Sequence, residues 1–209
     1  MLYYLIFRKE SINMGVTIEK ELRGPLTEEK YKQIIEYAEQ KGWKKHSYKQ
    51  VTIYCNTDSI PSIGTVTEGK GRLSVDIRDD VIKIKLKVGN ALEFSRSQYV
   101  TKCTRDSWEA IAVLLQVFGV TTGFGRTFDR TDLVSPNGVK LTTKLHCNMG
   151  NHFELERNDD GFETLNEFNT ILNELELYVW TKDEYSSAIQ HDHDTVTEVE
   201  ILSFLEKEL

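Results

Sequence analysis

The chain has 209 residues, with 26 Lys and Arg, 33 Asp and Glu, and a formal net charge of −7. This length is enough for one domain with a sizeable core, and the acidic balance argues against generic binding to long nucleic acids, whose phosphates attract a basic surface. No apolar run approaches the roughly 20 residues that span a bilayer. The totals therefore predict a soluble cytoplasmic protein that binds neither membranes nor long nucleic acids.

The domain pattern starts a short way into the chain. The opening MLYYLIF has no basic residue ahead of it and no small-residue cleavage site, so it does not have the form of a signal peptide. Residues 1–13 are interpreted as a leader, because regular alternation begins only after Met14, which could be an alternative start. Residues 14–209 carry no repeat and no low-complexity linker, which predicts a single domain.

Helices are predicted at four places. Thr27 is the N-cap of a helix with apolar residues at helical spacing up to Gly42. Asp106 or Ser107 caps a second helix, which Gly119 closes. Two further amphipathic helices are expected over 163–179 and 195–208.

Strands are predicted wherever polar and apolar residues alternate. The pair of runs around Asp79-Asp80 is typical of a hairpin. Because the strands follow one another with short turns and the helices stand between groups of strands, the order indicates an α+β fold with a mainly antiparallel sheet. The expected strands are 16–23, 48–57, 73–78, 81–88, 91–101, 124–134, 138–147 and 152–157.

Charged residues are sorted by type along these strands. Glu19, Glu21 and Arg23 share one face of the first strand, and Glu154 and Glu156 share one face of the last. If the sheet curls into a barrel, these charges all face one lumen. The basic candidates are Lys83, Lys85 and Lys87 on one strand face, Arg78 at the end of the partner strand, and Arg96, Arg126 and Arg130 on or near later strands.

This pattern predicts a site for a metal-bound polyphosphate. Carboxylates one strand step apart can hold a hard cation such as Mg²⁺ or Mn²⁺, and rows of Lys and Arg can neutralise phosphates. The alternative is a solvated sheet face with cross-strand ion pairs, each worth at most about 1 kcal/mol. Any single pair favours that alternative, whereas the joint pattern favours a site.

Two other features carry less information. Cys55, Cys103 and Cys147 are an odd number at wide spacing, which indicates buried thiols in a reducing compartment rather than disulfides or a zinc site. The tract HDHD at 191–194 contains metal-binding residue types, but we interpret it as a solvated turn in a polar loop before the last helix.

The charged strands resemble the signature of the CYTH superfamily, the triphosphate tunnel metalloenzymes. The Glu-x-Glu-x-basic strand at 19–23 opens that signature, and YCNTDS at 54–59 is similar to its Tyr-Phe-Asp-Thr strand end. LSVDIRDDVIKIKLK resembles its arginine-bearing and lysine-bearing strands, and NMGNHFELE at 148–156 resembles its Gly-x-Phe-x-Glu-x-Glu segment. The resemblance covers about residues 16–180 and implies an eight-stranded antiparallel β-barrel, a tunnel, with flanking helices.

The resemblance also implies roles for the candidate residues. Glu19, Glu21, Glu154 and Glu156 would hold Mg²⁺ or Mn²⁺. Arg78, Lys85 and Lys87, with Arg23 and with Arg126 or Arg130, would bind phosphate; Lys83 and Arg96 are counted with them. The catalytic candidates are Glu21 or Glu156, which would position and deprotonate the attacking water, and Lys85.

Several tunnel positions depart from the family pattern. Arg23 stands where lysine is usual, Gln98 where an acid is common, Asp76 where an arginine is usual, and Lys144 where an inward aspartate is usual. The resemblance implies a metal-dependent hydrolase of inorganic, thiamine or nucleoside triphosphate. The alternatives are a class IV adenylyl cyclase and a degenerate barrel that binds a nucleotide or polyphosphate without turnover. The expected partner is a small triphosphate or nucleotide, and the C-terminal helix could also serve a homodimer contact.

Overall fold

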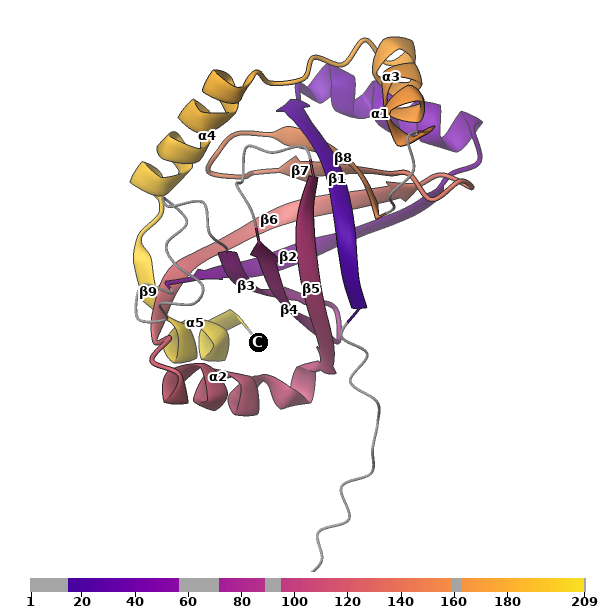
Figure 1. Cartoon of the computed structure of the whole chain (residues 1–209). Helices are drawn as coiled ribbons and strands as arrows, with labels where there is room; N and C mark the ends of the chain where they lie inside the picture. Colours follow the sequence, from indigo (N-terminus) through magenta and orange to yellow (C-terminus); the bar gives the residue numbers. More distant parts are fainter. Residues whose placement is uncertain (1–14, 57–71, 89–94, 159–162, 209) are drawn as a thin grey trace, which may run out of the picture.

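The computed structural model describes residues 15–56, 72–88, 95–158 and 163–208 (Figure 1). The interpreted leader and the second half of the YCNTDS motif lie outside the described residues, as does the start of the strand expected at 91–101.

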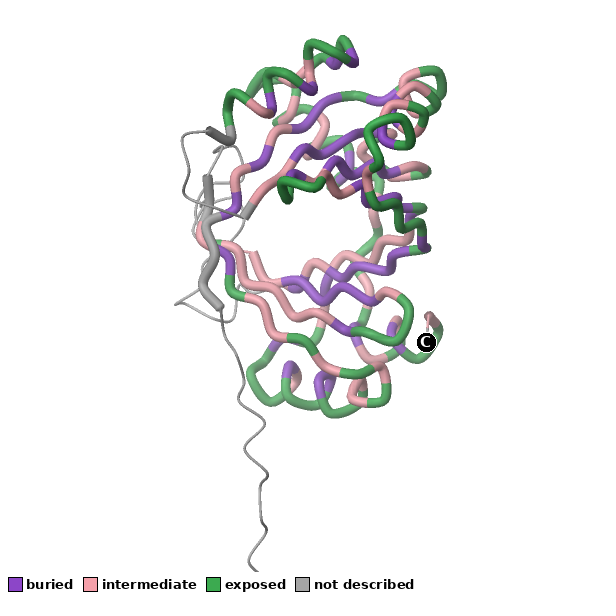
Figure 2. Tube along the Cα trace, turned by 90° about the vertical axis from the view of Figure 1, so that its right-hand side faces the viewer, coloured by how far each residue is buried: buried purple, intermediate pink, exposed green. Residues whose placement is uncertain are grey.

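Eight antiparallel strands form a closed ring. The strand order is β2-β3-β4-β5-β1-β8-β7-β6, and β6 pairs back to β2, so the predicted α+β fold with an eight-stranded barrel is confirmed. Figure 2 looks into this ring, which the strands surround on all sides. The strands are β1 (Gly15–Pro25), β2 (Lys44–Cys55), β3 (Arg72–Arg78), β4 (Val81–Val88), β5 (Ser95–Thr104), β6 (Thr122–Val134), β7 (Lys140–Leu145) and β8 (His152–Asn158).

The helices lie on the outside of the ring (Figure 1). Thr27 caps α1 as predicted, its hydroxyl accepting a hydrogen bond from the Lys30 amide at 3.1 Å. Among the described residues, no helix combines the length and the apolar character needed to span a membrane. The helices are α1 (Glu28–Gln40), α2 (Trp108–Val117), α3 (Glu163–Glu174), α4 (Lys182–Thr195) and α5 (Ile201–Glu208), with a 3₁₀ turn, η2 (Arg105–Ser107), before α2.

The C-terminal part of the chain differs from the sequence prediction. The helix expected over 195–208 is wrong in its first half, because Glu198–Glu200 forms a short strand, β9, that pairs with β6. The segment before it is the helix α4, which begins with a capping box between Thr181 and Glu184. The HDHD tract therefore lies in the last turn of a helix and not in a loop.

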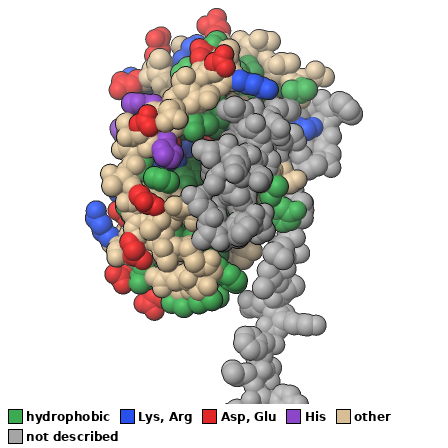
Figure 3. Space-filling view, turned by 60° about the vertical axis from the view of Figure 1, so that its left-hand side comes forward, with side chains coloured by type: hydrophobic (Ala, Val, Ile, Leu, Met, Phe, Trp, Pro, Cys, Tyr) green, Lys and Arg blue, Asp and Glu red, His purple; other side chains and the backbone are tan. Residues whose placement is uncertain are grey.

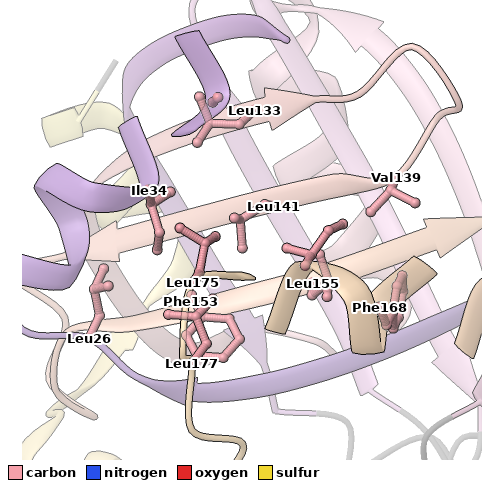
Figure 4. Close-up of a cluster of buried hydrophobic side chains, with 12 residues drawn as sticks. Leu26, Ile34, Leu133, Val139, Leu141, Phe153, Leu155, Phe168, Leu175 and Leu177 are labelled. Carbon is pink, nitrogen blue, oxygen red and sulfur yellow. The ribbon is translucent and has the colours of Figure 1, made fainter. Parts of the chain in front are cut away.

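Apolar side chains point outward from the ring into two separate cores. The first core joins the outer faces of β7 and β8 to α1 and α3, and Figure 4 shows its side chains gathered between these elements. The second joins β2, β3 and β4 to α2 and α5. Because successive strand residues face opposite ways, burying Phe153 and Leu155 in the first core turns Glu154 into the lumen. Each fully buried large apolar side chain stabilises the fold by about 1.5–3 kcal/mol.

Candidate active site inside the barrel

The polar faces of the strands meet inside the ring. Glu19, Glu21 and Arg23 of β1 are buried, as are Arg130 of β6 and Glu154 of β8. Acidic side chains are meanwhile spread over the outer surface in Figure 3. The basic candidates therefore gather in the interior of a protein whose total charge is −7.

Three carboxylates form a cluster in the lumen. Glu21 lies opposite Glu156 in the pairing of β1 with β8, and Arg23 lies opposite Glu154. One carboxylate oxygen from each of Glu21, Glu154 and Glu156 lies within 4.8 Å of the other two. Oxygen ligands at this separation suit a hard divalent cation. We call these three residues the carboxylate cluster.

Glu19, the fourth predicted metal ligand, lies one strand step away from the cluster. Its carboxylate accepts a hydrogen bond from the Lys87 ammonium, and the same ammonium lies 3.8 Å from Glu21. Lys87 thus links Glu19 to the cluster, and the role of Glu19 as a metal ligand stays a prediction.

Cations contact every member of the carboxylate cluster. Arg23 Nε donates to Glu154 Oε1 at 3.0 Å and its other end pairs with Glu21, while Lys144 Nζ lies 2.7 Å from the same Glu154 oxygen. Burial would raise the pKa of Glu154, but the attraction of Lys144 and Arg23 holds that pKa well below its usual range. Glu154 is therefore ionised at neutral pH, as metal binding requires. Lys140 contacts the third carboxylate, Glu156.

Both arginines of β6 face the lumen, which answers the choice that the sequence left open. Arg130 Nε lies 2.7 Å from Asp132 Oδ1, and its Nη1 donates to Gln50 at 3.2 Å. Arg126 reaches instead to Asp192 of α4 at 2.5 Å. The two arginines lie four residues apart on the same face of β6 and contact different partners: Arg130 contacts the strand residues Asp132 and Gln50, and Arg126 contacts α4.

Two of the remaining basic candidates, Arg78 and Lys85, contact side chains of neighbouring strands in the barrel. Arg78 Nη1 donates to the Tyr48 hydroxyl at 2.8 Å, and Lys85 Nζ lies 2.5 Å from Asp76 Oδ2. Lys83 is half-buried and stands opposite Asp76 in the pairing of β3 with β4. The backbone of Arg96 pairs with Glu19, and its side chain lies outside what the structure describes.

Two of the four positions that differ from the CYTH pattern, Asp76 and Lys144, change the sign of the charge, and both side chains are paired inside the barrel. Asp76 binds Lys85, and Lys144 binds Glu154. One position has gained an acid and the other a base, so their effects on the net charge of the lumen cancel. Asp76 and Lys144 nevertheless each form an ion pair with a residue that we predict to act on the substrate or to bind the metal.

Sequence reasoning missed several lumen residues. Asp132, Lys140 and Tyr48 lie on the lumen face of β6, β7 and β2, and strand parity alone could have identified them. Asp192 and Tyr185 could not have been found that way, because they belong to α4. The thiols agree with the prediction in part: Cys55 is buried, while Cys103 and Cys147 are half-buried, and all three are free.

Asp132 makes a testable contribution to acid stability. Burial would raise the pKa of its carboxyl, but Arg130 and Lys140 hold that pKa well below its usual range. Since the folded pKa lies below the unfolded value of about 4, this stabilisation is present above that value and is lost as the pH falls toward the folded pKa. Urea unfolding should therefore show Asp132→Asn less stable than the unmodified chain, by a larger margin at pH 7 than at pH 3.

The matched control is Asp80→Asn at the exposed turn between β3 and β4. This substitution should leave the free energy of unfolding nearly unchanged at both pH values. A destabilisation by Asp132→Asn that is equally large at pH 7 and pH 3 would contradict the assigned ion pair.

Comparison with known proteins identifies the fold. No protein-family model matches the chain, and no curated protein matches it. The PH1819 protein from Pyrococcus horikoshii is 16% identical, with a TM-score of 0.64 over 78% of this chain and 93% of its own. HpAC1 from Hippeastrum, a candidate adenylyl cyclase with a dominant triphosphatase activity, is 14% identical, with a TM-score of 0.53 over 78% and 89%. A candidate adenylate cyclase from Vibrio parahaemolyticus is 12% identical, with a TM-score of 0.56 over 82% and 99%.

These similarities show a shared fold. The barrel that the sequence motifs implied is thus confirmed, and the same fold occurs in proteins described as a cyclase and as a triphosphatase.

Proposed function

We propose that this chain is a divalent-metal-dependent hydrolase of the CYTH type that acts on a small triphosphate bound inside the barrel. The observation that carries the proposal is the carboxylate cluster of Glu21, Glu154 and Glu156, surrounded in one lumen by Arg23, Lys85, Lys87 and Arg130. A set of buried and half-buried acids and bases in this arrangement suits a ligand that brings both a cation and several phosphates. A cytoplasmic location and a homodimer belong to the same proposal.

The carboxylate cluster fits Mg²⁺ or Mn²⁺ by its chemistry, because it offers three carboxylate oxygens within reach of one ion. When bound there, the ion would supply charge stabilisation to the phosphoryl oxygens of the substrate. Glu19 would join this set if Lys87 turned toward a phosphate.

The basic residues would bind and orient the triphosphate. Arg23 and Arg130 can each present two N–H groups to phosphoryl oxygens, while Lys87 acts as a point charge. All three now pair with acids of the lumen, and a triphosphate would replace part of that pairing. Catalysis would then rest on positioning and electrostatic stabilisation, as in other phosphoryl transfers.

A carboxylate of the cluster is the proposed general base. Glu156 is paired with Lys140, and its carboxylate lies 3.9 Å from Arg130. Glu156, a member of the carboxylate cluster, therefore lies next to a predicted phosphate-binding residue. Burial and the nearby Arg130 lower the pKa of Lys140 to about 7. We assign the removal of the proton from the attacking water to Glu156 or Glu21.

Two alternatives have specific support. A class IV adenylyl cyclase is favoured by the fold shared with candidate cyclases; in that case the same groups would act on a ribose hydroxyl, with pyrophosphate leaving. A non-catalytic polyphosphate binder is favoured by the pairing of Lys144 with Glu154, because a lysine on a metal ligand competes with the metal.

A product assay separates these activities. The protein is incubated with Mg²⁺ or Mn²⁺ and, separately, with tripolyphosphate, thiamine triphosphate, ATP, GTP and triphosphorylated RNA, and the products are resolved by ion exchange. We expect free phosphate from a small triphosphate and no activity when EDTA replaces the metal. Pyrophosphate with a cyclic nucleotide would identify a cyclase, and tight binding without any product would identify the binder.

A further inference from the structure

Helix α4 contacts two arginines that we predict to bind phosphate. Asp192 Oδ2 lies 2.5 Å from Arg126 Nη2, and the guanidinium of Arg23 lies over the ring of Tyr185 at 4.9 Å from its centroid. Arg126 comes from β6 and Arg23 from β1, so the helix reaches lumen cations on two strands that are not neighbours in the ring. Figure 1 shows α4 running along one end of the barrel.

Asp192 differs from the other acids of its helix. It is 5% exposed, whereas Asp183, Glu184 and Asp194 of α4 are exposed. Burial raises the pKa of Asp192, against the attraction of Arg126. A carboxylate is costly to bury unless a cation compensates it, so the position of this residue depends on Arg126.

Arg126 has capacity for a larger anion than one carboxylate oxygen. Its guanidinium lies over the Tyr54 ring at 4.3 Å, and the guanidinium of Arg72 lies at 4.5 Å from the same ring. Among the described residues, the Nε of Arg126 is buried and has no hydrogen-bond acceptor. A phosphoryl group, with three oxygens, can accept from Nε and Nη2 together, which Asp192 does not do here.

We propose that, in the unliganded protein, the Asp192 carboxylate occupies the position on Arg126 that a terminal phosphoryl group of the ligand takes. A triphosphate then binds by displacing Asp192 from Arg126, and we call this displacement the exchange. This inference rests on the proposed function, because it takes the ligand of the lumen to be a triphosphate. Asp192 then lowers the affinity for substrate by competition, and the position of α4 depends on whether the site is filled.

The test compares the affinity for tripolyphosphate of the full chain with that of Asp192→Asn, by isothermal titration calorimetry with EDTA present so that nothing is hydrolysed. The substitution keeps the shape of the side chain and removes its charge. We expect Asp192→Asn to bind tripolyphosphate at least about fivefold more tightly, the lower end of ordinary coupling between sites. The matched control is Asp194→Asn, the same change two residues along on an exposed side chain that accepts from Gln190 at 2.8 Å.

A second substitution attributes the effect to Arg126. In an Arg126→Gln background, Asp192→Asn should no longer raise the affinity, because the cation for which Asp192 competes is gone. If Asp192→Asn and Asp194→Asn change the affinity equally, or if the effect persists without Arg126, the exchange is wrong while the proposed function stands. If neither the unmodified chain nor any variant binds tripolyphosphate, the exchange is wrong, and the product assay with metal decides the proposed function separately.

Discussion

Replacing Glu154 by Gln is expected to reduce the metal-dependent turnover of a triphosphate by at least about 100-fold. Glu154 belongs to the carboxylate cluster and binds both Arg23 and Lys144. Loss of outer partners alone typically reduces metal affinity or activity 10–100-fold, and Glu154 is a predicted direct ligand. The measurements are kcat/KM with the best substrate of the product assay and the Kd for Mn²⁺ from calorimetry.

The control is Glu206→Gln on α5, where the side chain is exposed, and it should match the unmodified chain in both measurements. Circular dichroism and Tm would show whether Glu154→Gln is folded, since it leaves Arg23 and Lys144 with less compensation in the interior. If a folded Glu154→Gln variant keeps its Mn²⁺ affinity and its turnover, the carboxylate cluster is not the metal site.

Replacing Phe153 by Ala is expected to destabilise the fold by about 3–5 kcal/mol. Phe153 is fully buried in the core between β8, α1 and α3. A Cβ on Gly24 would lie only 2.6 Å from its ring, so the ring packs directly on the β1 backbone. Truncation would leave a cavity beside β1 that the fixed strand pairing cannot close. Urea unfolding followed by tryptophan fluorescence measures the change.

The matched control is Phe118→Ala at the end of α2, where the side chain is 68% exposed; we expect a change within about 0.5 kcal/mol. A loss of less than about 1 kcal/mol for Phe153→Ala would show that this core is not packed as described. Phe153 and Glu154 are neighbours on one strand, so the two substitutions separate the stability of the outer face from the chemistry of the inner face.

Alternation in the sequence predicted the strands and the face on which each side chain lies, while the closure into an eight-stranded barrel was implied by the resemblance to the CYTH superfamily. Alternation over VIKIKLK and HFELE assigns each side chain to a face, and that assignment placed Lys85, Lys87, Glu154 and Glu156 in the lumen before any tertiary contact was known. Alternation does not show which charged side chains of the lumen form ion pairs, because ion pairing depends on the stagger between strands. The separation of Glu19 from the carboxylate cluster is one such outcome.

The helix α4 escaped prediction for a different reason. Its 14 residues, KDEYSSAIQHDHDT, carry few apolar side chains, and Asp192 is its one residue described as buried. A helix without an apolar stripe gives no periodic signal. Its contacts with the barrel are polar or aromatic, through Asp192 and Tyr185, and such contacts leave no pattern in the sequence. The capping box of Thr181 and Glu184 was its one local signal.

The pairing of β2 with β6 that closes the ring has a consequence for how the molecule folds. It joins Lys44–Cys55 to Thr122–Val134, and the hydrogen bond from Arg23 to Glu154 spans 131 positions of the chain. Contacts this distant form slowly, and the lumen charges find their partners only once the last strands have joined. A polyanion that binds the lumen of the folded barrel but not the unfolded chain would shift the folding equilibrium toward the folded state by mass action. Ligand binding and assembly of the barrel are therefore thermodynamically linked.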